Sequence, residues 1–141
     1  MALLSALAFA GCGGSDGPKL GKVSGTVTLD GQPVAAGYVV EFIPHTEEGR
    51  PDSSRRTSNG TTDDSGNYVL KHGTSEIEGA EIGKHGIVIA NAQEKRLPGA
   101  YSSGGDDARA FWVTVDSGSQ VVDIPLDSSP TPGQVDLEKK K

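Results

Sequence analysis

The strongest constraint on the fold is an alternation of apolar and polar residues near the start of the chain. In residues 22–29, small or apolar side chains occupy every second position, which is the period of a strand with one buried face. Asp30 and Gly31 supply the positive φ of a tight turn. A second alternating run, 38–43, ends at Pro44, which cannot donate a hydrogen bond to a sheet. Two half-buried strands are unstable alone in water, so the remaining chain must supply an opposing layer.

Similar signals recur along the chain and predict an all-β domain. Hydrophobic residues make up 34% of the chain and aromatic residues 5%, with 20 glycines and 8 prolines, which favours short strands and turns over helices. The predicted strands cover residues 22–29, 38–43, 57–62, 68–71, 83–89, 110–115 and 120–126. We expect hairpins that turn at 63–67 and at 116–118, and Pro125 marks the last strand as a sheet edge. These seven strands are expected to close as an antiparallel β-sandwich.

One large aromatic residue is predicted on the outer face of its strand. The apolar side chains of strand 110–115 stand at alternate positions, so Trp112 points to the opposite side, beside Thr114. Natural surfaces usually cover a tryptophan. The cover is either the long segment 91–109, which carries Tyr101, or a partner molecule, and we favour the segment because it directly precedes the strand. Trp112 and Tyr101 are therefore the candidate surface contacts.

The N-terminal segment suggests where the protein resides. Residues 1–10, MALLSALAFA, form an apolar run too short to span a bilayer, and small residues lead from it into Cys12, the only cysteine. This pattern resembles the lipobox of bacterial lipoproteins. The resemblance implies that residues 1–11 are a signal peptide and that acyl chains on Cys12 anchor the protein to the lipid bilayer. Residues 12–21 would form a flexible tether that reaches on the order of 30 Å. Gly13, in place of aspartate, implies the outer membrane rather than the inner one.

Three further motifs resemble a known domain family. They are VSGTVTLDGQPV at 23–34, FIP at 42–44 and GTTDDSGNY at 60–68. Together they resemble the carboxypeptidase regulatory-like (transthyretin-like, prealbumin-like) domain of bacterial envelope lipoproteins. The resemblance covers residues 22–127 and implies a seven-stranded Greek-key β-sandwich that serves as an accessory, adhesive or structural module. Residues 128–141, rich in proline and serine and ending in three lysines, are expected to form a disordered tail.

Several chemistries are not supported by the residues. A net charge of −6 and a pI near 4.9 argue against a nucleic-acid partner. His45, His72 and His85 lack the spacing of zinc ligands, and His85, on the inner face of its strand, is expected to be partly buried with a hydrogen-bond partner. The acidic turn 63–67 does not fit an EF-hand loop and is typical of a turn whose aspartates bond their own backbone. We therefore expect no metal and no cofactor.

These observations predict a protein without catalytic activity. The serines lie in tails and polar loops, including Ser15 of the one GxSxG match at 13–17, and the charged residues of 47–56 are typical of a solvated loop. We expect a membrane-tethered binding or structural module of the bacterial cell envelope, with its domain outside the cytoplasm. Its partner would be the bilayer, through Cys12, together with an unidentified envelope protein or glycan. The alternative is a carbohydrate-binding accessory module, which would need two or three coplanar exposed rings.

Overall fold

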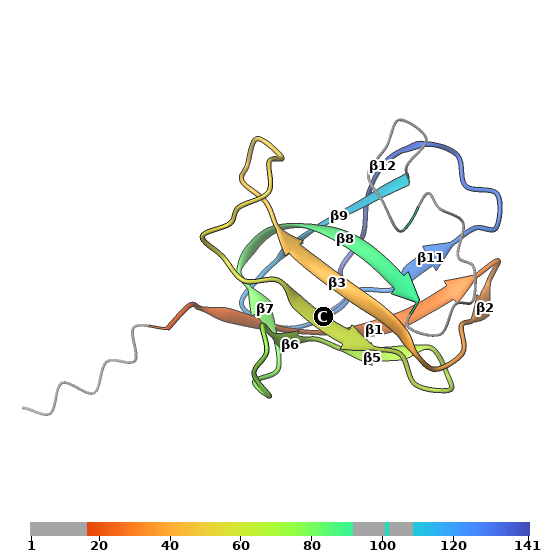
Figure 1. Ribbon diagram of the computed structural model, residues 1–141, viewed down its shortest axis with the longest axis horizontal. Coiled ribbons are helices and arrows are strands. Elements are labelled where there is room, and N and C mark those ends of the chain that lie inside the picture. The colour runs from red at the N-terminus through yellow and green to blue at the C-terminus, as the bar shows by residue number, and fades with distance from the viewer. Residues whose placement is uncertain (1–16, 92–100, 102–108) are drawn as a thin grey trace, which may run out of the picture.

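The fold is described from a computed structural model of the chain, in which residues 17–91, 101 and 109–141 are described. This part of the protein is all-β and consists of two six-stranded sheets. Figure 1 shows how these strands are arranged in space. Its residues form no α-helix, and therefore no helix that could cross a membrane. The two sheets enclose one apolar core, as the predicted β-sandwich requires.

The first sheet is built around the ten-residue strand β1, Leu20–Leu29. Three short strands pair with β1 in antiparallel orientation: β7 (Ala80–Glu81), β5 (Asn67–Val69) and β2 (Gln32–Pro33). Two strands pair with it in parallel orientation: β10 (Gly118–Val121) and β11 (Ile124–Leu126). The Val23 carbonyl accepts from Leu70 N–H, whereas the Ser24 carbonyl accepts from Val122 N–H, so the two groups lie on opposite sides of β1.

The second sheet is six strands wide. Its neighbouring strands, in spatial order, are β12 (Gly133–Asp136), β9 (Arg109–Val115), β8 (Gly83–Asn91), β3 (Tyr38–Pro44), β4 (Ser58–Thr61) and β6 (Lys71–His72). Every pair is antiparallel except β12 with β9. The longest ladder joins β3 to β8, whose paired residues run from Tyr38 with Asn91 to Pro44 with His85.

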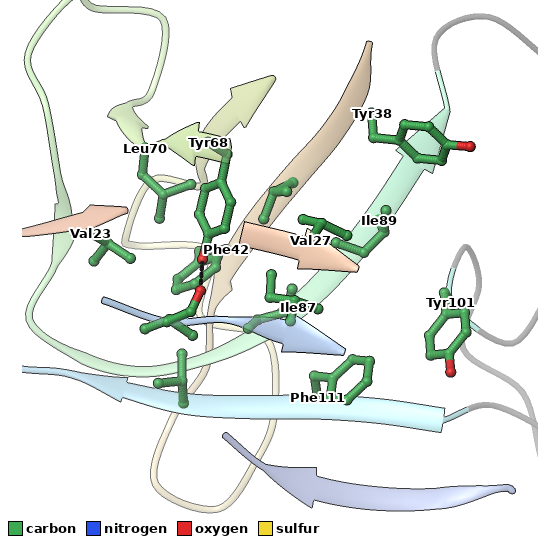
Figure 2. Close-up of a cluster of buried hydrophobic side chains, with 14 of the residues drawn as sticks. Val23, Val27, Tyr38, Phe42, Tyr68, Leu70, Ile87, Ile89, Tyr101 and Phe111 are labelled. Atoms are coloured by element: carbon green, nitrogen blue, oxygen red, sulfur yellow. Dashed lines mark hydrogen bonds between the residues drawn. The ribbon is translucent and has the colours of Figure 1, made fainter. Parts of the chain in front are cut away.

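The core contains the alternating residues that the sequence predicts. Tyr38, Val40 and Phe42 of β3 are buried, and the same is true of the alternate residues of β9 and of 122–126. Figure 2 shows Tyr38, Phe42 and Phe111 among the side chains of this core. The Tyr68 hydroxyl donates to the Val122 carbonyl over 2.6 Å, which satisfies the one polar group that this ring brings into the core. The turn at Asp30 and Gly31 is also confirmed, with φ of 51° and 82°.

The predicted hairpin around residues 63–67 is wrong for most of its length, because only Lys71 of the predicted returning strand pairs with the outgoing one, opposite Asn59. The returning strand divides between the sheets, because β5 pairs with β1 whereas β6 pairs with β4. Gly60 marks the point of divergence: a Cβ there would lie 2.3 Å from the Val69 carbonyl oxygen, so glycine permits the two layers to cross closely. The inward orientation of Tyr68 and Leu70 is confirmed, since both are buried.

The predicted hairpin at residues 116–118 is also wrong. Strand β9 lies in the second sheet, whereas β10 and β11 lie in the first. Both runs bury every second side chain, and placing them in opposite layers lets both apolar faces reach the same core. Pro125 lies at a sheet edge as predicted, because β11 pairs only with β1 among the described strands.

The segment after residue 127 differs from the expected disordered tail. Strand β12 extends the second sheet alongside β9, and Val135 and Leu137 pack against the core. The chain then reaches the first sheet, where the backbones of Lys140 and Val121 exchange two hydrogen bonds. The ammonium of Lys139 contacts the Asp116 carboxylate, and that of Lys140 contacts Asp123. The free edge of β9 orders a segment whose composition alone does not favour structure.

Candidate functional site

Trp112 lies on the outer face of the second sheet, as predicted, and it is half-buried. The His45 ring meets the indole in an edge-to-face contact, with centroids 4.7 Å apart and planes at 78°. The Lys84 ammonium lies 4.9 Å from the centre of the indole ring, within the range of a cation–π contact. The domain thus covers Trp112 with two side chains that the sequence analysis did not connect to it. Most of the expected cover, residues 91–109, lies outside the described residues.

Glycine and a backbone hydrogen bond hold His45 in place beside the indole. A Cβ on Gly86 would lie 2.9 Å from the His45 ring, so the ring occupies space that only glycine leaves free. His45 Nδ1 lies 2.8 Å from the Ile43 carbonyl, a distance at which the ring N–H donates to that oxygen. The indole N–H of Trp112 is buried and has no hydrogen-bond partner among the described residues.

Tyr101, the second candidate surface contact, belongs to the core instead. Its side chain is only 4% exposed and stacks on Phe111, with ring centroids 5.6 Å apart and planes within 5°. Its hydroxyl accepts a hydrogen bond from the Asp127 N–H over 2.9 Å. Figure 2 shows both rings at one end of the core. Tyr101 therefore has a structural role: its ring stacks on Phe111 and its hydroxyl binds the backbone after β11. Its assignment as a surface contact is wrong.

A polar network that the sequence analysis did not predict surrounds Glu81. Glu81 is 8% exposed as a residue, and its carboxylate accepts from the Arg56 N–H over 3.1 Å and lies 2.9 Å from His72 Nε2. Arg55 Nε lies 3.4 Å from its second oxygen. Burial alone would raise the pKa of Glu81, but these hydrogen bonds and the charges of His72 and Arg55 hold it below its usual value.

Arg55 therefore does not belong to a solvated loop as the sequence analysis expected. Besides its contact with Glu81, its guanidinium donates to the Ile82 carbonyl over 2.8 Å and to the His45 carbonyl over 3.3 Å. Gly83, with φ of 128°, leaves room for the guanidinium, since a Cβ there would lie 2.8 Å from it. Arg55 thus ties the loop after β3 to the start of β8. No spacing in the sequence connects it with Glu81, which lies 26 residues away.

His85 is fully buried rather than partly buried. Its Nδ1 lies 2.9 Å from the Gly83 carbonyl, whereas Nε2 is buried with no partner among the described residues. The ring packs 5.9 Å from that of Phe42. Burial lowers the pKa of His85 to about 4, because the charged form would lose its hydration inside the core. The side chain therefore remains neutral at physiological pH.

The groups of a hydrolytic triad lie near one another without forming an accessible site. Ser58 and His72 are cross-strand partners, and His72 contacts Glu81. The Ser58 hydroxyl is buried and has no hydrogen-bond partner in the described part of the chain, so neither base nor substrate reaches it. The described residues also contain no group of three ligands suited to a metal ion. The Asp63 carboxylate accepts from the N–H groups of Ser65 and Asn67, the turn geometry that the sequence predicts.

Cys12 itself lies outside the described residues, but the chain that follows it is described from Gly17 onward. Strand β1 starts at Leu20, two residues earlier than expected. In Figure 1 this end of β1 points away from the body of the domain, along its long axis.

Comparisons with known proteins provide no relative for this chain: no family model, curated protein or solved structure matches it.

Proposed function

We propose that this protein is a non-catalytic binding or structural module of the bacterial cell envelope, anchored to a membrane through Cys12. The observation that carries the proposal is the short distance along the chain between the lipobox-like cysteine and the fold. Strand β1 starts at Leu20, so residues 13–19 alone separate the two. Extended, that connection reaches about 30 Å at most, so an acylated Cys12 would hold the domain close to the bilayer.

The place where this connection enters the fold suits an anchor. It continues into β1, which is paired on both sides and is the central strand of its sheet. The first residues of β1 are already paired, Leu20 with Glu81 and Gly21 with Gly118. A load on the tether would therefore be shared among several ladders rather than peel off an edge strand.

A non-catalytic role is proposed because the histidines, the side chains best suited to catalysis, have structural roles. His45 packs on Trp112, His72 contacts Glu81, and His85 is buried. A binding or structural role is preferred to a carbohydrate platform because His45 and Lys84 occupy the surroundings of Trp112, whereas Tyr101 is buried. A glycan platform requires open rings instead.

Labelling with a fatty acid in cells tests the anchor. We expect Cys12→Ser to abolish incorporation and release the protein from the membrane fraction, while circular dichroism shows an unchanged fold. Ser15→Ala, a nearby change that keeps the thiol, serves as the control and should be labelled normally. Equal labelling of the Cys12→Ser variant and the parent would refute the anchor.

A separate experiment tests the binding role. The anchored domain is used as bait in solubilised envelope, and retained proteins and glycans are identified by mass spectrometry. We expect a specific envelope component that is absent when the domain is unfolded beforehand. Turnover of an ester, peptide or glycoside substrate by the purified protein would contradict the non-catalytic assignment.

A further inference from the structure

The described surface exposes four large apolar side chains, and one of them, Ile82, lies at the point where the tether leaves the domain, with Ile77 five residues before it. The most exposed is Ile77, at 62%, and Ile82 is 37% exposed. The other two, Val69 and Val121, lie further along the first sheet, where both strands reach the level of Ser24. Ile77 and Ile82 lie before and after β7 in the chain. Exposed apolar side chains of this kind often mark a surface that contacts another molecule or a membrane.

A hydrogen bond places Ile82 next to the start of β1, and Ile77 lies two residues before Gly79, which packs against Leu20. The Ile82 N–H donates to the Lys19 carbonyl over 3.1 Å, directly at the exit of the chain. Strand β7 pairs with Leu20 and Gly21, and Gly79 before it packs closely on Leu20. We call the surface formed by Lys19, Leu20, Ile77 and Ile82 the exit surface.

The backbone that presents the exit surface is well fixed. The Ile77 carbonyl accepts from the His72 N–H, and the Gly79 N–H donates to the Leu70 carbonyl, both over 2.8 Å. On the other side of β7, the Ile82 carbonyl accepts from Arg55 over the same distance. The network around Glu81 therefore also holds Ile82 in position. A fixed frame lowers the entropic cost of burying the two side chains against another surface.

We propose that the exit surface rests on the lipid bilayer that carries the anchor. The inference builds on the proposed acylation of Cys12, because residues 13–18 alone separate the cysteine from Lys19, the first residue of the exit surface. Two isoleucines form a weak membrane contact alone. A tether this short raises their effective concentration at the bilayer, so a weak contact is sufficient to orient the domain.

The charges around Ile77 indicate which bilayer chemistry the surface accepts. Glu76 and Glu78 flank it, Lys71 pairs with Glu76, and Lys19 lies at the chain exit. This mixture of signs gives no basic patch of the kind that selects anionic lipids. Contact is therefore driven by the apolar side chains, and a zwitterionic bilayer is an adequate probe.

The test places a tryptophan on the exit surface and asks whether lipid quenches it. In the full chain, Trp112→Phe removes the only native tryptophan, and Ile77→Trp introduces a reporter. The unique thiol of Cys12 is coupled to a maleimide-headgroup lipid in phosphatidylcholine vesicles that contain brominated acyl chains. We expect strong quenching of this reporter and little quenching of the matched control with Val69→Trp. Adding Ile82→Ser should reduce the quenching, whereas adding Val121→Ser should not.

Two results would overturn the proposal. The first is equal quenching, or none, of the two reporters in variants whose circular dichroism matches the parent. The second is a blue, concentration-dependent emission of the Ile77→Trp variant without vesicles, because a second copy of the chain would then cover the surface. The coupling is chemical, so this experiment is independent of whether cells acylate Cys12, which the fatty-acid labelling decides separately.

Discussion

Replacing His85 by phenylalanine is expected to make the domain less sensitive to acid. In the native fold, burial lowers the pKa of His85 to about 4, whereas in the unfolded chain it lies near 6.5. The unfolded state therefore binds a proton in this interval that the native state rejects. The contribution of the neutral His85 ring to the free energy of unfolding is fully present above pH 6.5 and is lost as the pH falls towards 4.

The size of the effect follows from the difference between the two pKa values. Each pKa unit corresponds to about 1.4 kcal/mol, so the full loss amounts to about 3 kcal/mol, of which about 2 kcal/mol falls between pH 7 and pH 5. Carboxylates remain mostly ionised in that narrower range. His85→Phe removes this contribution, and it also removes a buried Nε2 without a partner next to Phe42.

Urea denaturation of parent and variant at both pH values provides the measurement. The quantity to compare is the difference in unfolding free energy between the two proteins, because titrations that they share cancel. We expect that difference to shift by about 2 kcal/mol in favour of the variant on going from pH 7 to pH 5. A difference that is the same at both pH values would show that His85 titrates normally and would refute its burial. His85→Leu, measured in the same way, guards against a poor fit of the larger ring.

Three further substitutions and one addition of metal test other parts of the structure. Glu81→Gln leaves Arg55 without its charge partner, and we expect it to lower the free energy of unfolding by about 1–3 kcal/mol in urea denaturation. An unchanged free energy would show that the network around Glu81 does not stabilise the fold. Gly60→Ala should cost at least about 1 kcal/mol, because the new methyl would meet the Val69 carbonyl, and a neutral result would contradict the close crossing of the layers. His45→Ala should shift the emission of Trp112 to the red and increase quenching by acrylamide, whereas unchanged emission would show that His45 does not cover the indole. Millimolar calcium should leave the melting temperature unchanged, and a rise that Asp63→Ala abolishes would reveal a metal site at that turn.

The sequence predicts which side chains are buried better than it predicts which strands pair. Alternation correctly assigns Tyr38, Phe42, Tyr68 and Phe111 to the core, because every strand of a sandwich turns one face inward. The same pattern is compatible with either layer. Strand β5 pairs with β1 rather than β4, and Gly60 lies close to the Val69 backbone where the layers cross; alternation encodes neither feature.

The contacts of the polar residues could not be predicted from the sequence for a related reason. Arg55 and Glu81 meet only because the fold brings a loop and a short strand together, and a charged loop has the same composition whether or not it packs. Residues 133–136 form a strand because β9 offers a free edge, although their composition indicates disorder. The position of Trp112 followed from strand pleating, but His45 and Lys84 cover it from two other segments.

The most direct test of the central claim is the intact mass of the protein isolated from bacterial envelope. The account predicts a mature chain that begins at Cys12 and carries the added mass of several acyl chains on that residue, since a single chain holds a protein only reversibly. A chain that retains residues 1–11, or one whose Cys12 has an unmodified thiol, would contradict it.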